Sequence, residues 1–369
     1  MARLFKVVRW RRCWQVLFFL WTLLVGVLFT LWAFAHLRGQ TPAVNRPPGV
    51  EGFLPISALM SLRLWLAGEG VHPVHPAGLA ILVGALLMSA TVARSFCSHL
   101  CPVGAVSEWL GRLGRRLLGS TWELPRVLDW FLRSVKWLLL AFFLWAVLVA
   151  MDLAQVRSFL DSPYNRVADV KMLLFFAQPS RLTVAVVGVL VVGSVLVRDL
   201  WCRYFCPYGA LVGLMGLLAP WKVVRDPKRC TNCKVCSKVC PARLPVHRLA
   251  RVRSVECTGC QDCVASCPVE GCLRLAAARR RLRPAHGVLL AVGVYLAVTW
   301  GFRLAGHWRG VVSEEEYARR LREIHSPLYT HVGGMAPPEK EPAVRAPGPA
   351  SSAFPARESS NLGLPPPGE

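Results

Sequence analysis

The runs CTNCKVCSKVCP (residues 230–241) and CTGCQDCVASCP (residues 257–268) share one cysteine pattern. Each run places its cysteines as C-x2-C-x2-C-x3-C-P, without a gap or a substitution. Three closely spaced thiolates can hold one face of a cubane iron–sulfur cluster, while the fourth, fixed by the following proline, reaches a second cluster. The pattern therefore predicts two [4Fe–4S] clusters whose ligands cross between the runs.

The two predicted clusters divide eight cysteines between them. The first set is Cys230, Cys233, Cys236 and Cys267, and the second set is Cys257, Cys260, Cys263 and Cys240. Zinc knuckles or a disulfide framework are the alternatives, but zinc sites usually combine two ligand pairs that are separated by a longer interval. We call residues 221–283 the ferredoxin block, because the spacing is that of bacterial two-cluster ferredoxins, and we expect an α+β fold for it.

The remainder of the chain has the composition of a membrane protein. Hydrophobic residues make up 54% of the sequence and charged residues only 18%, which is too apolar for an ordinary soluble protein. We expect an α-helical integral membrane protein of about five transmembrane helices with the ferredoxin block inserted before the last. Apolar runs place four spans in a membrane domain of residues 1–220, and a fifth after the block. The expected spans are residues 14–35, 77–93, 137–151, 182–197 and 285–302.

The two ends of the chain carry different signals. The basic start and the long charge-free run that follows it predict an uncleaved anchor rather than a cleaved secretory signal. Residues 303–369 are expected to form a largely disordered outer tail that begins with a short helix at residues 314–324, since its end is rich in Pro, Ala, Ser and Gly.

Lysine and arginine predict the orientation. The formal net charge is +23, and 29 basic residues fall on the side of the ferredoxin block against 15 on the other side. The positive-inside rule then places the block in the cytoplasm and the tail in the periplasm of a bacterial inner membrane. Because the basic residues flank apolar spans instead of covering one soluble face, we expect the bilayer as a partner and no nucleic acid.

A second cysteine motif occurs twice. Residues 94–105 read RSFCSHLCPVGA and residues 200–210 read LWCRYFCPYGA, so both contain C-x3-C-P-x-G-A at the inner end of an expected span. This predicts a parallel repeat of two helix pairs. Cysteines four residues apart lie on one helix face, so Cys97, Cys101, Cys202 and Cys206 are expected to meet. A third iron–sulfur cluster, a pair of redox-active disulfides and four simply buried thiols remain open as interpretations.

Other candidate residues give weaker signals. His99 lies inside the first motif, where a structural role is favoured over accepting a proton from a quinol. The pair His72 and His75 is interpreted as part of a loop, and Cys13 and Cys272 as unremarkable. No Ser/His/Asp set, carboxylate pair or glycine-rich phosphate loop is evident, so catalytic residues are not assigned.

Residues 12–283, with the ferredoxin block and both C-x3-C-P motifs, resemble the membrane polyferredoxins of the quinol-dehydrogenase type. Relatives of that family include the nitrous-oxide reductase regulator and the cytochrome cbb3 oxidase assembly protein. The resemblance implies electron transfer between the quinone pool or a cytoplasmic donor and a partner redox protein, with quinone as a further candidate cofactor. The fifth span and the tail depart from the nitrate-pathway member of the family, which leaves the partner open. A redox assembly factor for a metalloenzyme and a redox sensor are the alternative functions.

Overall fold

The computed structural model describes residues 2–277 and 280–329, with side chains from residue 10 onward. The chain divides into two units, Met1–Ala336 and Pro337–Glu369. The second unit, and with it the end of the expected outer tail, lies outside the described residues.

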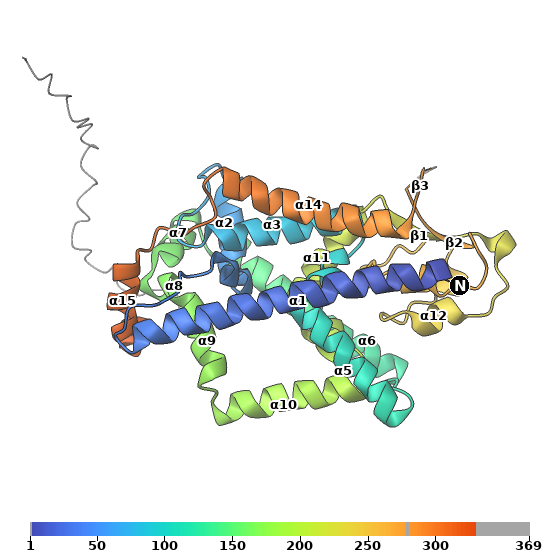
Figure 1. Cartoon of the computed structure of the whole chain (residues 1–369), viewed down its shortest axis with the longest axis horizontal. Coiled ribbons are helices and arrows are strands. Elements are labelled where there is room, and N and C mark those ends of the chain that lie inside the picture. Colours follow the sequence, from blue (N-terminus) through green and yellow to red (C-terminus); the bar gives the residue numbers. More distant parts are fainter. Residues whose placement is uncertain (1, 278–279, 330–369) are drawn as a thin grey trace, which may run out of the picture. The chain divides into compact units, whose positions relative to one another are not determined.

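Long apolar helices form the body of the first unit. Three of them are long and apolar enough to cross a bilayer, among the residues that the structure describes: α1 (Ala2–Leu37), α6 (Arg126–Trp145, continued by a π-helical turn η2, Ala146–Ala150) and α14 (Pro284–Leu304). In Figure 1, α1 and α14 run in nearly the same direction, with α3 (Pro76–Thr91) against α14. The third expected span, residues 137–151, is therefore the second half of a longer helix.

A fourth apolar segment is broken. Helices α9 (Ala168–Ala177) and α10 (Arg181–Leu196) together are apolar enough for one span, but they meet at 78°. Pro179 disfavours helical geometry at the residue before it, and the Ser180 hydroxyl caps the new helix by accepting a hydrogen bond from the Thr183 amide at 3.1 Å. The expected span of residues 182–197 is thus one arm of a bent pair. Helix α3, the expected second span, has only 16 residues.

Short elements gather at the end of the unit where α1 stops, and we call them the cap (Figure 1). The cap consists of η1 (Pro48–Phe53), α2 (Pro55–Leu66), α7 (Leu153–Asp161), α8 (Pro163–Arg166), α15 (Glu314–Arg322) and η6 (Pro327–Tyr329). Helix α15 packs on α1, where the Trp32 indole donates a 2.9 Å hydrogen bond to Glu314. The first part of the expected outer tail is therefore folded, and its short helix lies where the sequence predicts.

The ferredoxin block lies at the opposite end of α1 (Figure 1). It contains an antiparallel sheet of β1 (Lys222–Arg225), β2 (Leu273–Ala277) and β3 (Arg280–Leu282), with Val223 opposite Leu275. The short helices α12 (Val235–Val239) and α13 (Asp262–Ala265) lie within the two cysteine runs. Lys222 ties the sheet to the apolar helix α11 (Pro207–Leu218), because its Nζ donates to the carbonyls of Gly216 and Leu217 at 2.9 and 3.0 Å.

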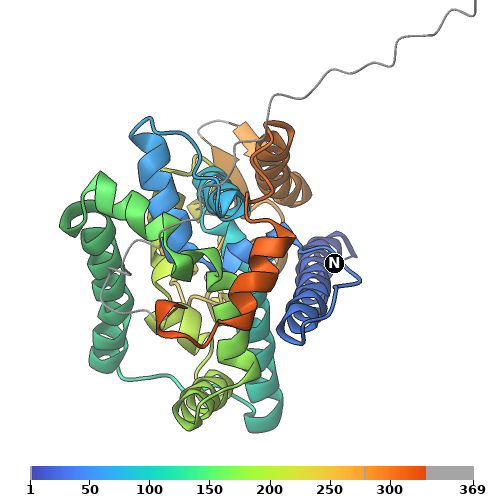
Figure 2. The same cartoon turned by 90° about the vertical axis from the view of Figure 1, so that its left-hand side faces the viewer.

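Helix α10 is held mainly by α5 (Pro102–Leu118), and it is seen almost end-on at the bottom of Figure 2. The crossing is close because Gly114 has no side chain: a Cβ there would lie 1.9 Å from the Val195 carbonyl oxygen.

Replacing Gly114 by alanine is expected to separate α5 from α10 and to lower the free energy of unfolding by about 1–3 kcal/mol, the usual cost of overpacking. Thermal denaturation in detergent measures the change. The matched control is Gly188→Ala on α10, where nothing lies within 4 Å of the added carbon. Equal stability of the two variants would contradict the close crossing.

Candidate metal centres

Each C-x3-C-P motif forms a corner between two helices. After α3 the chain turns through Ala93, whose φ of 46° is left-handed, and after α10 it turns through Asp199 with a φ of 57°. The first cysteine then lies in a short helical turn, α4 (Ser95–His99) or η3 (Trp201–Phe205). The second cysteine, Cys101 or Cys206, occupies the N-cap of the next helix, with proline at its first position. The two corners therefore have the same design.

The glycine of the first C-P-x-G-A motif has a steric reason. A Cβ on Gly104 would lie 2.2 Å from the Cys97 carbonyl oxygen, so only glycine lets the turn close over the first cysteine. In the second motif the amide of Gly209 donates a 3.2 Å hydrogen bond to the Cys206 sulfur. Amides at a helix N-terminus stabilise a thiolate, so the helix ends at both corners offset part of the cost of charging the buried sulfur.

The two corners bring four thiols together. Electrostatic interactions link Cys202 to the other three, and link Cys97 and Cys101 to Cys206. Burial raises the pKa of Cys97 to about 11 and that of Cys101 to about 12, and it also raises the pKa values of Cys202 and Cys206. Four thiols in this setting lose their protons only to a strongly bound cation. The expected meeting of the two motifs is thus present in the structure.

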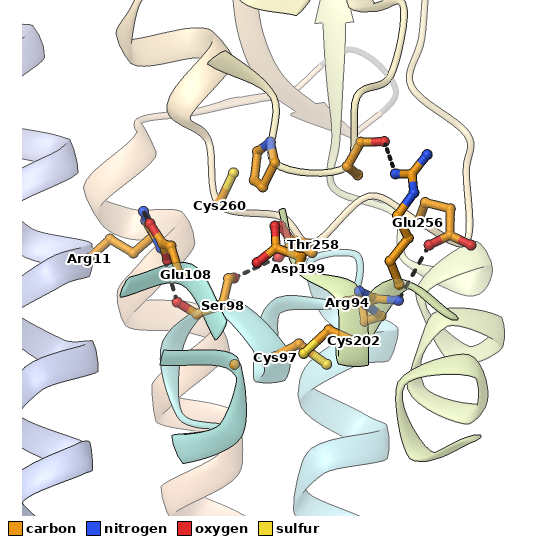
Figure 3. A pocket seen from close by; sticks show the side chains of 14 residues that line it. Arg11, Arg94, Cys97, Ser98, Glu108, Asp199, Cys202, Glu256, Thr258 and Cys260 are labelled. Atoms are coloured by element: carbon orange, nitrogen blue, oxygen red, sulfur yellow. Dashed lines mark hydrogen bonds and ion pairs between the residues drawn. The ribbon is translucent and has the colours of Figure 1, made fainter. Parts of the chain in front are cut away.

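Two buried cations stand beside these thiols. Arg94 is 5% exposed and its Nη1 donates to the Gly209 carbonyl at 3.3 Å, while Lys136 from α6 donates to Glu256 at 2.5 Å. Arg94 and Lys136 oppose the rise in pKa of Cys97 and Cys206 that burial causes. Figure 3 shows Arg94 beside Cys202, with its ion pair to Glu256 at 3.8 Å. The two cations therefore offset part of the cost that burial places on a negative charge at sulfur.

The thiols separate two hollows of different character. Cys97 and Cys202 line a small polar hollow whose other wall carries Cys260 of the ferredoxin block (Figure 3). Cys101 and Cys206 line an apolar cavity of about 590 Å³ that extends toward the cap. Its wall includes aromatic residues of α1, α4, η3, α11 and α14, namely Phe18, Trp21, Phe96, Trp201, Tyr208, Tyr295 and Trp300.

The ferredoxin block contains two further hollows lined by cysteines. Cys230, Cys233, Cys236 and Cys267 line the first, and Cys240, Cys257, Cys260 and Cys263 line the second. These are the two crossed sets expected from the spacing.

The cysteine runs that form these hollows also share a backbone path. Asn232 and Gly259 have φ values of 57° and 63°, and Lys234 and Gln261 have values of 60° and 62°. The two halves of the block thus bend at equivalent positions.

The donor sets suit iron–sulfur clusters rather than single ions. In the part of the chain that the structure describes, no three His, Cys, Asp or Glu side chains lie close enough to hold one metal ion. A cubane keeps its four thiolates farther apart than one ion does, and each ferredoxin hollow offers four thiols around a central space. The assignment of these cysteines as ligands stays a prediction.

The corner of the first motif is fastened to the second ferredoxin hollow. The Arg94 amide donates to the Cys257 carbonyl at 3.2 Å, and the Ser98 hydroxyl donates to the Thr258 carbonyl at 2.6 Å. Arg11 of α1 makes two 2.9 Å bonds to Glu108 and one of 3.3 Å to Asp262, next to Cys263. Backbone and charge contacts thus hold the two sets of cysteines at a fixed separation.

The histidines occupy structural positions. His99 is fully buried, its Nδ1 is 2.9 Å from the Ser95 carbonyl oxygen, and burial lowers its pKa to about 4, so the ring is neutral. It is not among the residues that line the apolar cavity. His75 is buried in the cap against Glu51, and His72 lies 3.3 Å from Asp161. Sequence reasoning missed Arg94, Lys136 and Glu256, because nothing in their local sequence indicates that they meet.

Family models match the cysteine regions. A model described as a 4Fe-4S binding domain matches twice, at residues 74–121 and 182–225, which agrees with the internal repeat. A model described as a 4Fe-4S dicluster domain matches residues 222–268.

Several curated proteins are similar to the chain. The putative electron transport protein YccM of Escherichia coli strain K12 is 41% identical over 330 residues, which cover 87% of this chain and 92% of that protein. The regulatory protein NosR of Stutzerimonas stutzeri is 27% identical over 46% of this chain and 22% of its own length. The ferredoxin-type protein NapH of E. coli is 26% identical over 57% of this chain and 70% of its own length. No solved structure matches the chain with significance.

Replacing Glu108 by glutamine should leave the buried Arg11 charge with only its 3.3 Å contact to Asp262 and lower the free energy of unfolding by about 3 kcal/mol. The pair holds the pKa of Glu108 below its usual range. A carboxylate with a depressed folded pKa contributes its full stability above its unfolded pKa of about 4.3, so the loss should be equal at pH 6 and pH 8. Thermal unfolding measures this loss of stability. Glu123→Gln, at an exposed position, is the control, and a loss of the same size there would contradict the anchoring role.

Proposed function

The chain belongs to the NapH/NosR-type polyferredoxin family of iron–sulfur electron-transport proteins, and we propose that it passes electrons between the quinone pool or a cytoplasmic donor and a partner redox enzyme. The position of the four C-x3-C-P thiols supports this proposal most strongly. One pair faces an apolar cavity among the membrane helices, and the other pair faces a ligand set of the ferredoxin block.

In this proposal three groups of cysteines hold redox centres in sequence. Cys97, Cys101, Cys202 and Cys206 hold a third iron–sulfur cluster, in addition to the two [4Fe–4S] clusters of the ferredoxin block. Bound clusters supply one-electron redox chemistry. The chain itself half-buries the thiols, supplies amide donors from two helix ends and places Arg94 and Lys136 beside the charge. A pair of redox-active disulfides is the alternative use of these four thiols.

The side chains of Arg94 and Lys136 have a defined electrostatic role. A cluster with four thiolate ligands carries net negative charge, and each added electron increases it, so nearby positive charge favours the reduced form. Glu256 compensates one of the two cations and directly precedes Cys257. We therefore infer that Arg94 and Lys136 keep the third centre reducible despite its burial.

The apolar cavity suits the ring of an isoprenoid quinol. Tyr208 and Tyr295 line it near Cys101 and Cys206, and within the described residues neither hydroxyl has a hydrogen-bond partner. Such hydroxyls can bond the two ring oxygens of a quinol, while the aromatic wall holds the ring. Oxidation of the quinol releases two protons to solvent and two electrons, which the chain accepts one at a time.

The membrane arrangement is part of the same proposal. Five spans place the ferredoxin block in the cytoplasm and the cap and tail in the periplasm, with α3 and the bent pair α9–α10 as the two short or broken spans. In favour of this, the basic residues concentrate on the side of the ferredoxin block. Around the exposed Cys233, the solvent-facing residues Lys228, Lys234, Lys238 and Arg248 offer an acidic redox protein a docking surface.

Removing Cys97 and Cys202 together, as a double alanine variant, should lower the iron content of anaerobically purified protein from about twelve to about eight atoms per chain, because one cubane is lost. Iron and acid-labile sulfide analysis measures the change, and unchanged EPR signals from the ferredoxin block show that the variant is folded. Cys13→Ala, exposed on α1, is the control. About eight irons in both wild type and double variant would overturn the third cluster.

Replacing Tyr208 or Tyr295 by phenylalanine should slow reduction of the clusters by a quinol about tenfold, since one hydrogen bond to the ring is worth about 1.4 kcal/mol. Stopped-flow absorbance with a soluble quinol analogue measures the rate. Dithionite should reduce both variants as fully as the wild type, which shows that the clusters are intact. Wild-type rates with the quinol in both variants would exclude the cavity as its binding site.

A further inference from the structure

A fifth thiol lies in the first ferredoxin hollow. Cys272 lines the same space as Cys230, Cys233, Cys236 and Cys267. It is only 3% exposed. The C-x2-C-x2-C-x3-C-P pattern assigns no role to this residue, because it falls five positions beyond the last cysteine of the second run.

The fold holds Cys272 firmly at this wall. Gly271, with a φ of 75°, turns the chain into β2. The Cys272 amide donates to the Val269 carbonyl at 3.3 Å, and its carbonyl accepts a 2.8 Å bond from the Asp226 amide. These contacts on both sides fix the backbone, so the thiol cannot leave the hollow without breaking the edge of the sheet.

The Cys272 side chain lies between two of the expected ligands. It interacts with the side chains of both Cys230 and Cys267. Its remaining polar contact is weak, a 3.8 Å approach of the sulfur to the Asp226 carbonyl oxygen. The sulfur is therefore free to move toward the centre of the hollow with little loss of other interactions.

The second hollow has no such residue. Its wall contains Cys240, Cys257, Cys260 and Cys263 and no further cysteine among the described residues. The two hollows also differ in access, because Cys233 of the first is exposed whereas Cys260, its equivalent in the second, is partly buried. The additional thiol thus accompanies the hollow that is more open to solvent and to oxidants.

We propose that Cys272 is a reserve ligand for the first centre, able to replace Cys230 or Cys267 on the cluster. In the exchange the Cys272 thiol gives its proton to the departing cysteine, one iron–sulfur bond forms and one breaks, and no electron is transferred. The reserve ligand keeps the cluster bound when Cys230 or Cys267 leaves it as a protonated thiol. This inference rests on the proposed function, since it needs a cluster in the first hollow.

The test compares single and double alanine variants of the full-length protein, purified anaerobically. In Cys230→Ala the neighbouring thiol should retain the first cluster, so the iron content should equal that of the wild type. In the double variant Cys230→Ala, Cys272→Ala the content should fall by about four atoms. Cys257→Ala is the matched control: it removes the equivalent first cysteine of the other run, which has no spare thiol beside it, and it should lose about four irons.

Two further measurements separate the possible outcomes. Cys272→Ala alone should keep the wild-type iron content, because the four expected ligands remain. Equal losses of iron in Cys230→Ala and Cys257→Ala would overturn the reserve role while leaving the proposed function intact. A wild-type protein without iron in the ferredoxin block would instead overturn the proposed function itself.

Discussion

Burial of four thiols at the junction of two helix corners is the constraint on which the rest of the structure depends. Once a bound cluster takes the protons from these thiols, the junction is stable only if the sulfur charge is matched, because an unpaired buried charge is costly. The chain places two helix N-termini, Arg94 and Lys136 around the thiols, and glycine at the points of closest approach. The same corner also fastens the membrane helices to the loop before Cys260, through Arg94 and Ser98.

The two sides of this junction face different surroundings. Cys101 and Cys206 face the apolar cavity, and Cys97 and Cys202 face Cys260 across a polar hollow. The second ferredoxin hollow follows, then the first, whose Cys233 is exposed. An electron path through these groups would run from the membrane interior to a basic surface. Long helices α1 and α14 flank this path, and the ion pairs of Arg11 hold α1 to both sets of cysteines.

Sequence reasoning succeeded where local spacing determines local geometry. The ferredoxin pattern predicts which cysteines line each hollow, and the repeated C-x3-C-P motif predicts that its four cysteines meet. The bend between α9 and α10 and the packing of the predicted tail helix on α1 were not foreseen, because both depend on distant contacts. Arg94 and Lys136 were missed for the same reason, and Cys272 was interpreted as unremarkable. Lys136 lies 120 residues from Glu256 in the chain, and an isolated lysine in an apolar run reveals nothing about its partner.

The most direct test is a density map of the anaerobically purified protein in which iron is located by anomalous scattering. The account predicts iron at three places: within the first ferredoxin hollow, within the second, and between the corners that carry Cys97 and Cys202. Iron in the ferredoxin block alone, with the four corner cysteines packed against one another or joined as disulfides, would contradict it.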